Sequence, residues 1–265
     1  MSELLASFEN LPPEWCAGFG ALFGLIIGSY LATLALRWPS GETASQGRSR
    51  CDGCGKALGW YELIPLLSYA VRRGRCGSCG ARIDPVHPIT EVAAALIGAL
   101  SFALHPGWEG LAGAVFGWTL LVLAILDIRH FWLPNRLTLP LVALGIGGAW
   151  LFGMPRLIDS LVGALASFLL LFVINNIYRA LRSRDGLGGG DSKMLAAIGA
   201  WLGWQMLPIV LLLASATGLL AVLFSILRGR KVKATDRLPF GAFLAVVAWP
   251  LWLSRDALQA FLHAL

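Results

Sequence analysis

The sequence Gly186-Leu187-Gly188-Gly189-Gly190-Asp191-Ser192-Lys193 places one carboxylate at the start of a long apolar segment. A charge within or beside a membrane segment is costly, so an acid at this place indicates a functional site. Glycines let the backbone approach a ligand or a neighbouring helix closely. A second acid, Asp127, ends the apolar run 117–126. We expect Asp127 and Asp191 to meet at one membrane face and to act as a pair, with motif support from Gly188, Gly190 and Lys193.

The composition is that of a polytopic membrane protein. The 265 residues are 57% hydrophobic and 14% charged, with a mean hydropathy of +0.71, whereas soluble domains carry about 25% charged residues. The net charge of +6 arises from basic residues in the loops between apolar runs, without interleaved aromatics. This distribution is a topology signal of membrane proteins and argues against nucleic acid as a partner.

The apolar runs predict an all-α protein with about eight transmembrane helices and a small cytosolic loop domain. Eight Lys and Arg residues in residues 37–88 place this loop in the cytosol and the N-terminus in the periplasm. The same membrane orientation places Asp127 and Asp191 at the cytosolic face. The predicted spans are Trp15–Leu36, Ile89–Leu104, Leu111–Leu126, Leu137–Phe152, Leu157–Tyr178, two spans within Met194–Leu227 broken at Trp204–Pro208, and Phe240 to about Leu262.

We divide the chain into three regions on this basis. Residues 1–36 form a periplasmic tail and the first transmembrane helix, residues 37–88 a cysteine-rich cytosolic region, and residues 89–265 the membrane core that carries both acids. The cytosolic region is too small to build its own hydrophobic core, so it needs another source of stability.

Four cysteines supply that source. Cys51, Cys54, Cys76 and Cys79 form a C-x2-C-x21-C-x2-C array in which each pair lies beside glycines. Four thiolates make a closed tetrahedral zinc site, which is structural because no position is left for water. The spacer is slightly longer than the usual zinc-ribbon range of about 15–20 residues. A pair of redox dithiols is the alternative interpretation.

The two acids suit hydrolysis without a metal or a nucleophilic side chain. Two carboxylates held close together cannot both ionise easily, so the pair shares a proton. One carboxylate can then accept a proton from water while the other donates a proton to the substrate. The alternative from another class is a transporter in which the two acids bind a cation or relay protons.

Taken together, these motifs resemble the type IV prepilin peptidase family, which are bifunctional leader peptidases and N-methyltransferases of the GxGD membrane aspartyl protease type. The resemblance runs nearly end to end. It rests on Gly28-Ser29, Arg48-Ser49-Arg50-Cys51, Ile64-Pro65-Leu66-Leu67-Ser68-Tyr69, Arg73-Gly74-Arg75-Cys76, Asp127 with Leu133-Pro134-Asn135, and Gly188–Lys193 followed by Ala196–Gly203.

The resemblance implies a function in the bacterial inner membrane. It implies an aspartic endopeptidase that cuts the short basic leader of a prepilin or pseudopilin after glycine at the cytosolic face, with Asp127 and Asp191 as catalytic acids. It further implies methylation of the new N-terminus with S-adenosyl-L-methionine. The expected partners are the hydrophobic helix of the substrate and the lipid bilayer.

The sequence departs from the family pattern mainly outside the acid motifs. The departures are Ala32, Glu62-Leu63, Val86-His87, Asn135 and Ala242. Most lie in or near the cytosolic region linked to methyl transfer, so a peptidase without methyltransferase activity stays open as an alternative.

Overall fold

The protein is described by a computed structural model that covers residues 11–42, 44, 47–153, 155–182, 188–231, 233 and 237–264. These residues are mainly α-helical and form no β-strand, only isolated bridges between Arg50 and Ala57 and between Arg75 and Arg82. The predicted all-α class is therefore confirmed. The chain forms two compact units, Met1–Val122 and Leu123–Leu265, with the boundary inside one helix, α5 (Trp108–His130).

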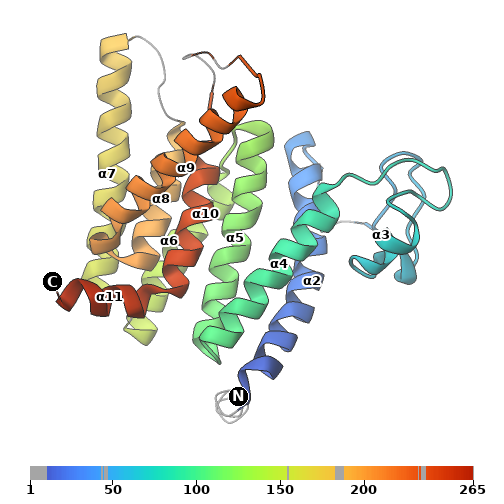
Figure 1. Cartoon of the computed structure of the whole chain (residues 1–265), viewed down its shortest axis with the longest axis horizontal. Coiled ribbons are helices and arrows are strands. Elements are labelled where there is room, and N and C mark those ends of the chain that lie inside the picture. Colours follow the sequence, from blue (N-terminus) through green and yellow to red (C-terminus); the bar gives the residue numbers. More distant parts are fainter. Residues whose placement is uncertain are drawn as a thin grey trace. The chain divides into compact units, whose positions relative to one another are not determined.

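Two helices pack side by side along their lengths in the first unit, α2 (Pro13–Arg37) and α4 (Val86–Leu104) (Figure 1). The contact follows from small residues: Gly20, Gly24 and Gly28 of α2 lie directly against the backbone of α4. Close backbone approach through glycine is the usual way that membrane helices associate. The loop between them carries the short helices η1 (Trp38–Ser40), η2 (Trp60–Leu63) and α3 (Leu67–Val71).

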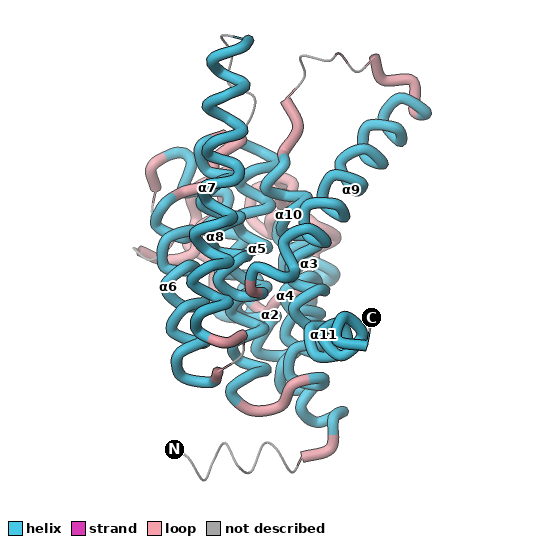
Figure 2. Tube along the Cα trace, turned by 90° about the vertical axis from the view of Figure 1, so that its left-hand side faces the viewer, coloured by secondary structure: helices cyan, strands magenta, loops and turns pink. Residues whose placement is uncertain are grey.

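The second unit is organised around α8 (Gly189–Leu202). Apart from Lys193, every residue of α8 from Asp191 onward is buried. A helix that is apolar on all sides belongs in the core of its unit. Helix α8 packs against α7, α6 and α10 and also contacts η3, which follows it in the chain (Figure 2). The other helices of this unit are α6 (Asn135–Phe152), α7 (Leu157–Arg182), η3 (Trp204–Met206), α9 (Leu207–Leu227), α10 (Phe240–Leu253) and α11 (Arg255–Ala264).

Hydrogen bonds and close packing hold α8 in place. The Trp201 indole donates to the Leu141 carbonyl of α6 at 2.9 Å, and the Ser160 hydroxyl of α7 donates to the Ala200 carbonyl at 2.7 Å. Gly163 of α7 and Gly199 of α8 touch backbone to backbone. These contacts fix the position of α8, and with it the position of Asp191 near the N-terminus of this helix.

Six of the described helices are long and apolar enough to cross a membrane: α2, α4, α5, α6, α7 and α9. With α8 and α10, which have 14 residues each, they account for the eight predicted spans. A 14-residue helix is about 21 Å long, shorter than the roughly 30 Å hydrocarbon layer. Eight is therefore an approximate number, and the multi-pass class is confirmed.

One predicted boundary is wrong and another is confirmed. The last span was expected to run to about Leu262, but α10 ends at Leu253 and a separate helix, α11, follows. The break falls at Ser254, whose φ of −97° and ψ of 9° depart from the helical values. The predicted break after α8 is present at Gly203, whose φ of 79° favours glycine.

Candidate active site

The first acid of the site is held by the start of α8. Gly188 precedes the helix, and Asp191 is its third residue. The Gly188 amide donates to Asp191 Oδ2 at 2.9 Å, while the Asp191 amide donates to the Gly188 carbonyl at 3.0 Å. A carboxylate at this place satisfies a backbone amide that the helix leaves free. Gly186 and Leu187 lie outside the described residues.

The second acid is held by the start of a different helix. Asp127 lies in the last turn of α5, and its Oδ2 accepts a hydrogen bond from the Ala242 amide of α10 at 2.9 Å. The first amides of a helix have no partner within that helix and attract negative charge. The N-terminus of α10 is thus a third component of the site. It lies 115 residues from Asp127 in the sequence, and no short-range motif predicts the contact.

Gly241 brings the two acids together. Its backbone amide interacts with the carboxylates of both Asp127 and Asp191, and the charge of Asp127 acts on Asp191. A methyl group added to Gly241 would lie 3.0 Å from Asp127 Oδ2, closer than ordinary packing allows. The structure therefore places both carboxylates beside one backbone amide, and their action as a catalytic pair stays a prediction.

Both acids are withdrawn from solvent. Asp127 is 5% exposed and Asp191 is 6% exposed. The Oδ1 atom of Asp191 is buried, and among the described residues it has no hydrogen-bond partner. Leaving a buried carboxylate oxygen unpaired costs free energy, so this atom is available for a proton, a water molecule or a substrate group.

The supporting residues of the motif have separate roles. A methyl group on Gly190 would lie 2.7 Å from the Cβ atom of Leu133, so Gly190 is required by close packing. Lys193 donates to Asn135 Oδ1 at 2.7 Å, which links the start of α8 to the start of α6. The α10 amides are the part of the site that the sequence alone did not reveal.

The four cysteines of the array form one cluster in the first unit. Their sulfur atoms all lie within 4.8 Å of one another, and Cys51 and Cys79 are 3.8 Å apart. A tetrahedral zinc ion with 2.3 Å bonds requires sulfur atoms about 3.8 Å apart. All four are free thiols in the structure. The donor set and its spacing therefore fit a soft metal ion.

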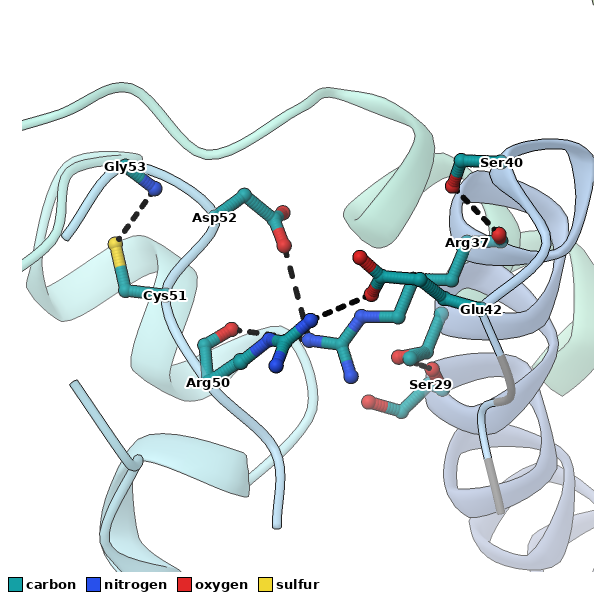
Figure 3. Close-up of polar contacts among 9 residues, drawn as sticks. Ser29, Arg37, Ser40, Glu42, Arg50, Cys51, Asp52 and Gly53 are labelled. Atoms are coloured by element: carbon teal, nitrogen blue, oxygen red, sulfur yellow. Dashed lines mark hydrogen bonds and ion pairs between the residues drawn. The ribbon is translucent and has the colours of Figure 1, made fainter. Parts of the chain in front are cut away.

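Each cysteine pair forms the same turn. The amides of Gly53 and Ser78 point at the sulfurs of Cys51 and Cys76, at 3.4 and 3.5 Å, and Figure 3 shows the first of these contacts. The amides of Cys79 and Ser78 lower the pKa of the Cys76 thiol to about 6, whereas the neighbouring thiols, Cys54 first, raise the pKa of the Cys79 thiol to about 11. In each turn a glycine with positive φ, Gly55 at 70° and Gly80 at 73°, follows the second cysteine.

Two family models match the parts of the sequence that hold the two acids and the four cysteines. A family model described as the type IV leader peptidase family matches residues 114–223, and one described as the bacterial peptidase A24 N-terminal domain matches residues 22–105. No solved structure matches the chain.

Curated relatives match most of the chain. A prepilin leader peptidase/N-methyltransferase of Aeromonas hydrophila is 40% identical over 80% of this chain and 73% of its own length. Proteins with the same description from Burkholderia pseudomallei (strain K96243) and Pseudomonas putida are 35% and 30% identical, over 91% and 97% of this chain and 86% and 96% of their own lengths. The two family models and these relatives cover both the cysteine array and the two acids, and the chain belongs to the type IV leader peptidase family.

Proposed function

We propose that this protein is a membrane aspartyl endopeptidase that removes the leader of a type IV prepilin or pseudopilin, with Asp127 and Asp191 as its catalytic acids. One observation carries the proposal: two buried carboxylates from distant segments meet at the amides of one helix N-terminus. The printed names of the relatives supply the substrate class. They favour peptide hydrolysis over cation transport by the same acids.

The two acids divide the chemistry of hydrolysis. One carboxylate takes a proton from water as the water oxygen bonds to the carbonyl carbon of the leader glycine, while the protonated acid donates to the carbonyl oxygen. The tetrahedral intermediate then collapses, the C–N bond breaks, and the departing nitrogen takes up a proton. The products are a leader carboxylate and a new N-terminal amine. The unpaired Oδ1 of Asp191 is suited to exchange these protons.

The same protein then methylates the new amine, as the second half of the relatives' name indicates. S-adenosyl-L-methionine supplies the methyl group: the amine lone pair forms the C–N bond, the S–C bond breaks with its electron pair moving to sulfur, and the amine releases one proton. The chain's part in this reaction is to bind the donor and to present the amine in its uncharged form.

The cysteine array has a structural part in the proposal. Cys51, Cys54, Cys76 and Cys79 would hold one zinc ion that joins the two turns and stabilises residues 37–88. The basic loops of the sequence place this region and both acids on the cytosolic side of the inner membrane, with the N-terminus in the periplasm.

Replacement of either acid tests the peptidase. The purified protein in detergent is incubated with a synthetic prepilin, and the products are read by intact mass. Asp127→Asn and Asp191→Asn should each lower turnover by about 10²–10⁴-fold or more, because one proton-transfer group is removed. Asp159→Asn is the matched control, since Asp159 is also buried but bonds Arg156 and Trp204.

The control variant should cleave the prepilin at close to the normal rate. Near-normal turnover by either Asp127→Asn or Asp191→Asn, in protein that is monodisperse by size exclusion, would refute the assignment of the acids.

A further inference from the structure

Lys193 is a charged residue of the α8 motif that the hydrolysis itself does not use. It lies two residues after Asp191 and, unlike the rest of α8 from Asp191 onward, it is not buried. Its ammonium donates to Asn135 Oδ1 at 2.7 Å, and among the described residues it forms no ion pair with either acid. Lys193 is therefore committed to the start of α6, which lies 58 residues away in the sequence.

The loop that leads to Asn135 begins at the turn that carries Asp127. Phe131 follows the last residue of α5 and has a φ of 49°, a backbone conformation that residues with a side chain rarely adopt. Its amide donates to the Asp127 carbonyl at 2.9 Å. Strained conformations of this kind persist only where the surrounding contacts hold them. The chain therefore turns sharply just after Asp127 and is held there by its surroundings.

Leu133 occupies the middle of this loop and lies against the starts of two helices. An added Cβ atom would lie 2.7 Å from Leu133 Cβ at Gly190, and 2.9 Å from Leu133 Cδ1 at Gly241. Gly190 directly precedes Asp191, and the Gly241 amide faces both acids. Leu133 thus contacts both of the backbone segments that hold the two carboxylates.

Three hydrogen bonds fix the end of the loop on α6. The Pro134 carbonyl accepts from the Leu137 and Thr138 amides at 3.0 and 3.1 Å, and from the buried Thr138 hydroxyl at 3.3 Å. These bonds join the loop to the first turn of α6. The hydrogen bond from Lys193 to Asn135 then joins that turn to α8, close to Asp191.

We infer that Lys193 and Asn135 are positioning residues of the peptidase: their hydrogen bond holds loop 131–134 in place, so that Leu133 fixes the spacing between the starts of α8 and α10. The inference rests on the proposed peptidase. Neither residue touches the reacting atoms. Proton transfer among two acids, a water molecule and a peptide depends steeply on distance, and a misplacement of about 1 Å can lower a rate by about 100-fold.

A lysine near the membrane surface can also serve only to reach the interface with its charge. The two roles predict different results. Contacts between exposed side chains contribute little to stability, and the contact between Lys193 and Asn135 is exposed. Its loss should therefore leave the melting temperature nearly unchanged in either case, whereas a fall in kcat is expected only if the contact positions the acids.

Three substitutions test the contact in the purified full chain in detergent. Lys193→Met removes the donor, and Asn135→Leu removes the acceptor at similar side-chain size, whereas Asn135→Asp keeps the acceptor oxygen. Arg136→Met is the matched control, because it removes an exposed cation from the same turn of α6 and leaves the contact intact. Cleavage of a synthetic prepilin, read by intact mass, gives kcat and KM, and thermal unfolding gives the melting temperature.

We expect Lys193→Met and Asn135→Leu each to lower kcat by about tenfold or more, with the KM and the melting temperature nearly unchanged. Because both remove the same contact, the double variant should be slower than either single variant by less than about twofold. Asn135→Asp should regain most of the kcat that Asn135→Leu loses, and Arg136→Met should cleave at close to the normal rate.

Normal kcat values for Lys193→Met and Asn135→Leu would overturn the inference and leave the peptidase standing. So would an equal fall for Arg136→Met, which would assign the effect to charge, or additive losses in the double variant, which would assign separate roles to the two residues. A melting temperature that falls in step with kcat would show a purely structural contact. If the unaltered protein cleaves no prepilin, the peptidase and the positioning role fall together.

Discussion

At the scale of single residues, the candidate active site depends on backbone groups. Backbone amides of Ala242, Gly188 and Gly241 position Asp127 and Asp191, and among the described residues no ion pair holds either acid. Backbone amides at helix ends are fixed before the substrate arrives, so they cost no reorganisation during the reaction. The precision of the dyad therefore depends on the space available at Gly241.

Gly241→Ala should lower the kcat for prepilin cleavage by about tenfold to a hundredfold, because an added methyl group displaces Asp127. The KM should change little, since the substitution acts on the position of a reacting group. Gly147→Ala is the control, because no atom lies within 4 Å of that added methyl group. A normal kcat for Gly241→Ala would show that the carboxylate tolerates the shift.

At the scale of helices, each unit depends on one close crossing. In the first unit Gly24 of α2 meets Ala94 of α4, and in the second Gly163 of α7 meets Gly199 of α8, each through backbone atoms. Helices inside a membrane gain little from the hydrophobic effect, so close packing must supply their association. A side chain at these glycines has backbone in its way, which cannot move aside.

Gly24→Leu and Gly199→Leu should each destabilise the fold by at least about 1–3 kcal/mol. Gly18→Leu and Gly148→Leu are matched controls on α2 and α6, where the added side chain meets open space. Thermal unfolding in detergent, followed by size exclusion, measures the difference. Equal melting temperatures for the crossing variants and their controls would refute the contribution of these two helix crossings to stability.

At the scale of the whole molecule, the cysteine array and the two acids lie in different units. The array belongs to the first unit, while the two acids and the α10 amides that hold them belong to the second. A metal that folds one small region is expected to affect the activity of that region first.

Removal of the metal should therefore abolish methylation while cleavage persists. Chelation of the purified protein, or Cys51→Ser with Cys76→Ser, should yield a cleaved but unmethylated product by intact mass, and zinc should restore methylation after chelation. Cys16→Ala is the control, since Cys16 is buried outside the array. Parallel loss of both activities would show that the array also supports the peptidase.

The sequence predicted those parts of the molecule that rest on composition and short motifs. The cysteine array and the multi-pass class follow from spacing and hydropathy. The cost of intramembrane charge singled out Asp127 and Asp191, whose action as a catalytic pair stays a prediction. The contact between Asp127 and Ala242 was not predictable, because it joins residues 115 apart through a backbone amide that every residue type except proline supplies. The end of α10 was also misplaced, because a short polar break inside an apolar run leaves the average hydropathy high.

The position of Leu133 has a consequence for how relatives of this protein vary. Its side chain occupies the space that a Cβ atom would need at both Gly190 and Gly241, so three positions far apart in the sequence share one small volume. Neither glycine has a positive φ, so the requirement is for room and not for an unusual backbone. We expect chains with a smaller residue at position 133 to accept alanine at position 190, which makes these two positions a compensating pair, whereas at position 241 the Asp127 carboxylate still lies in the way.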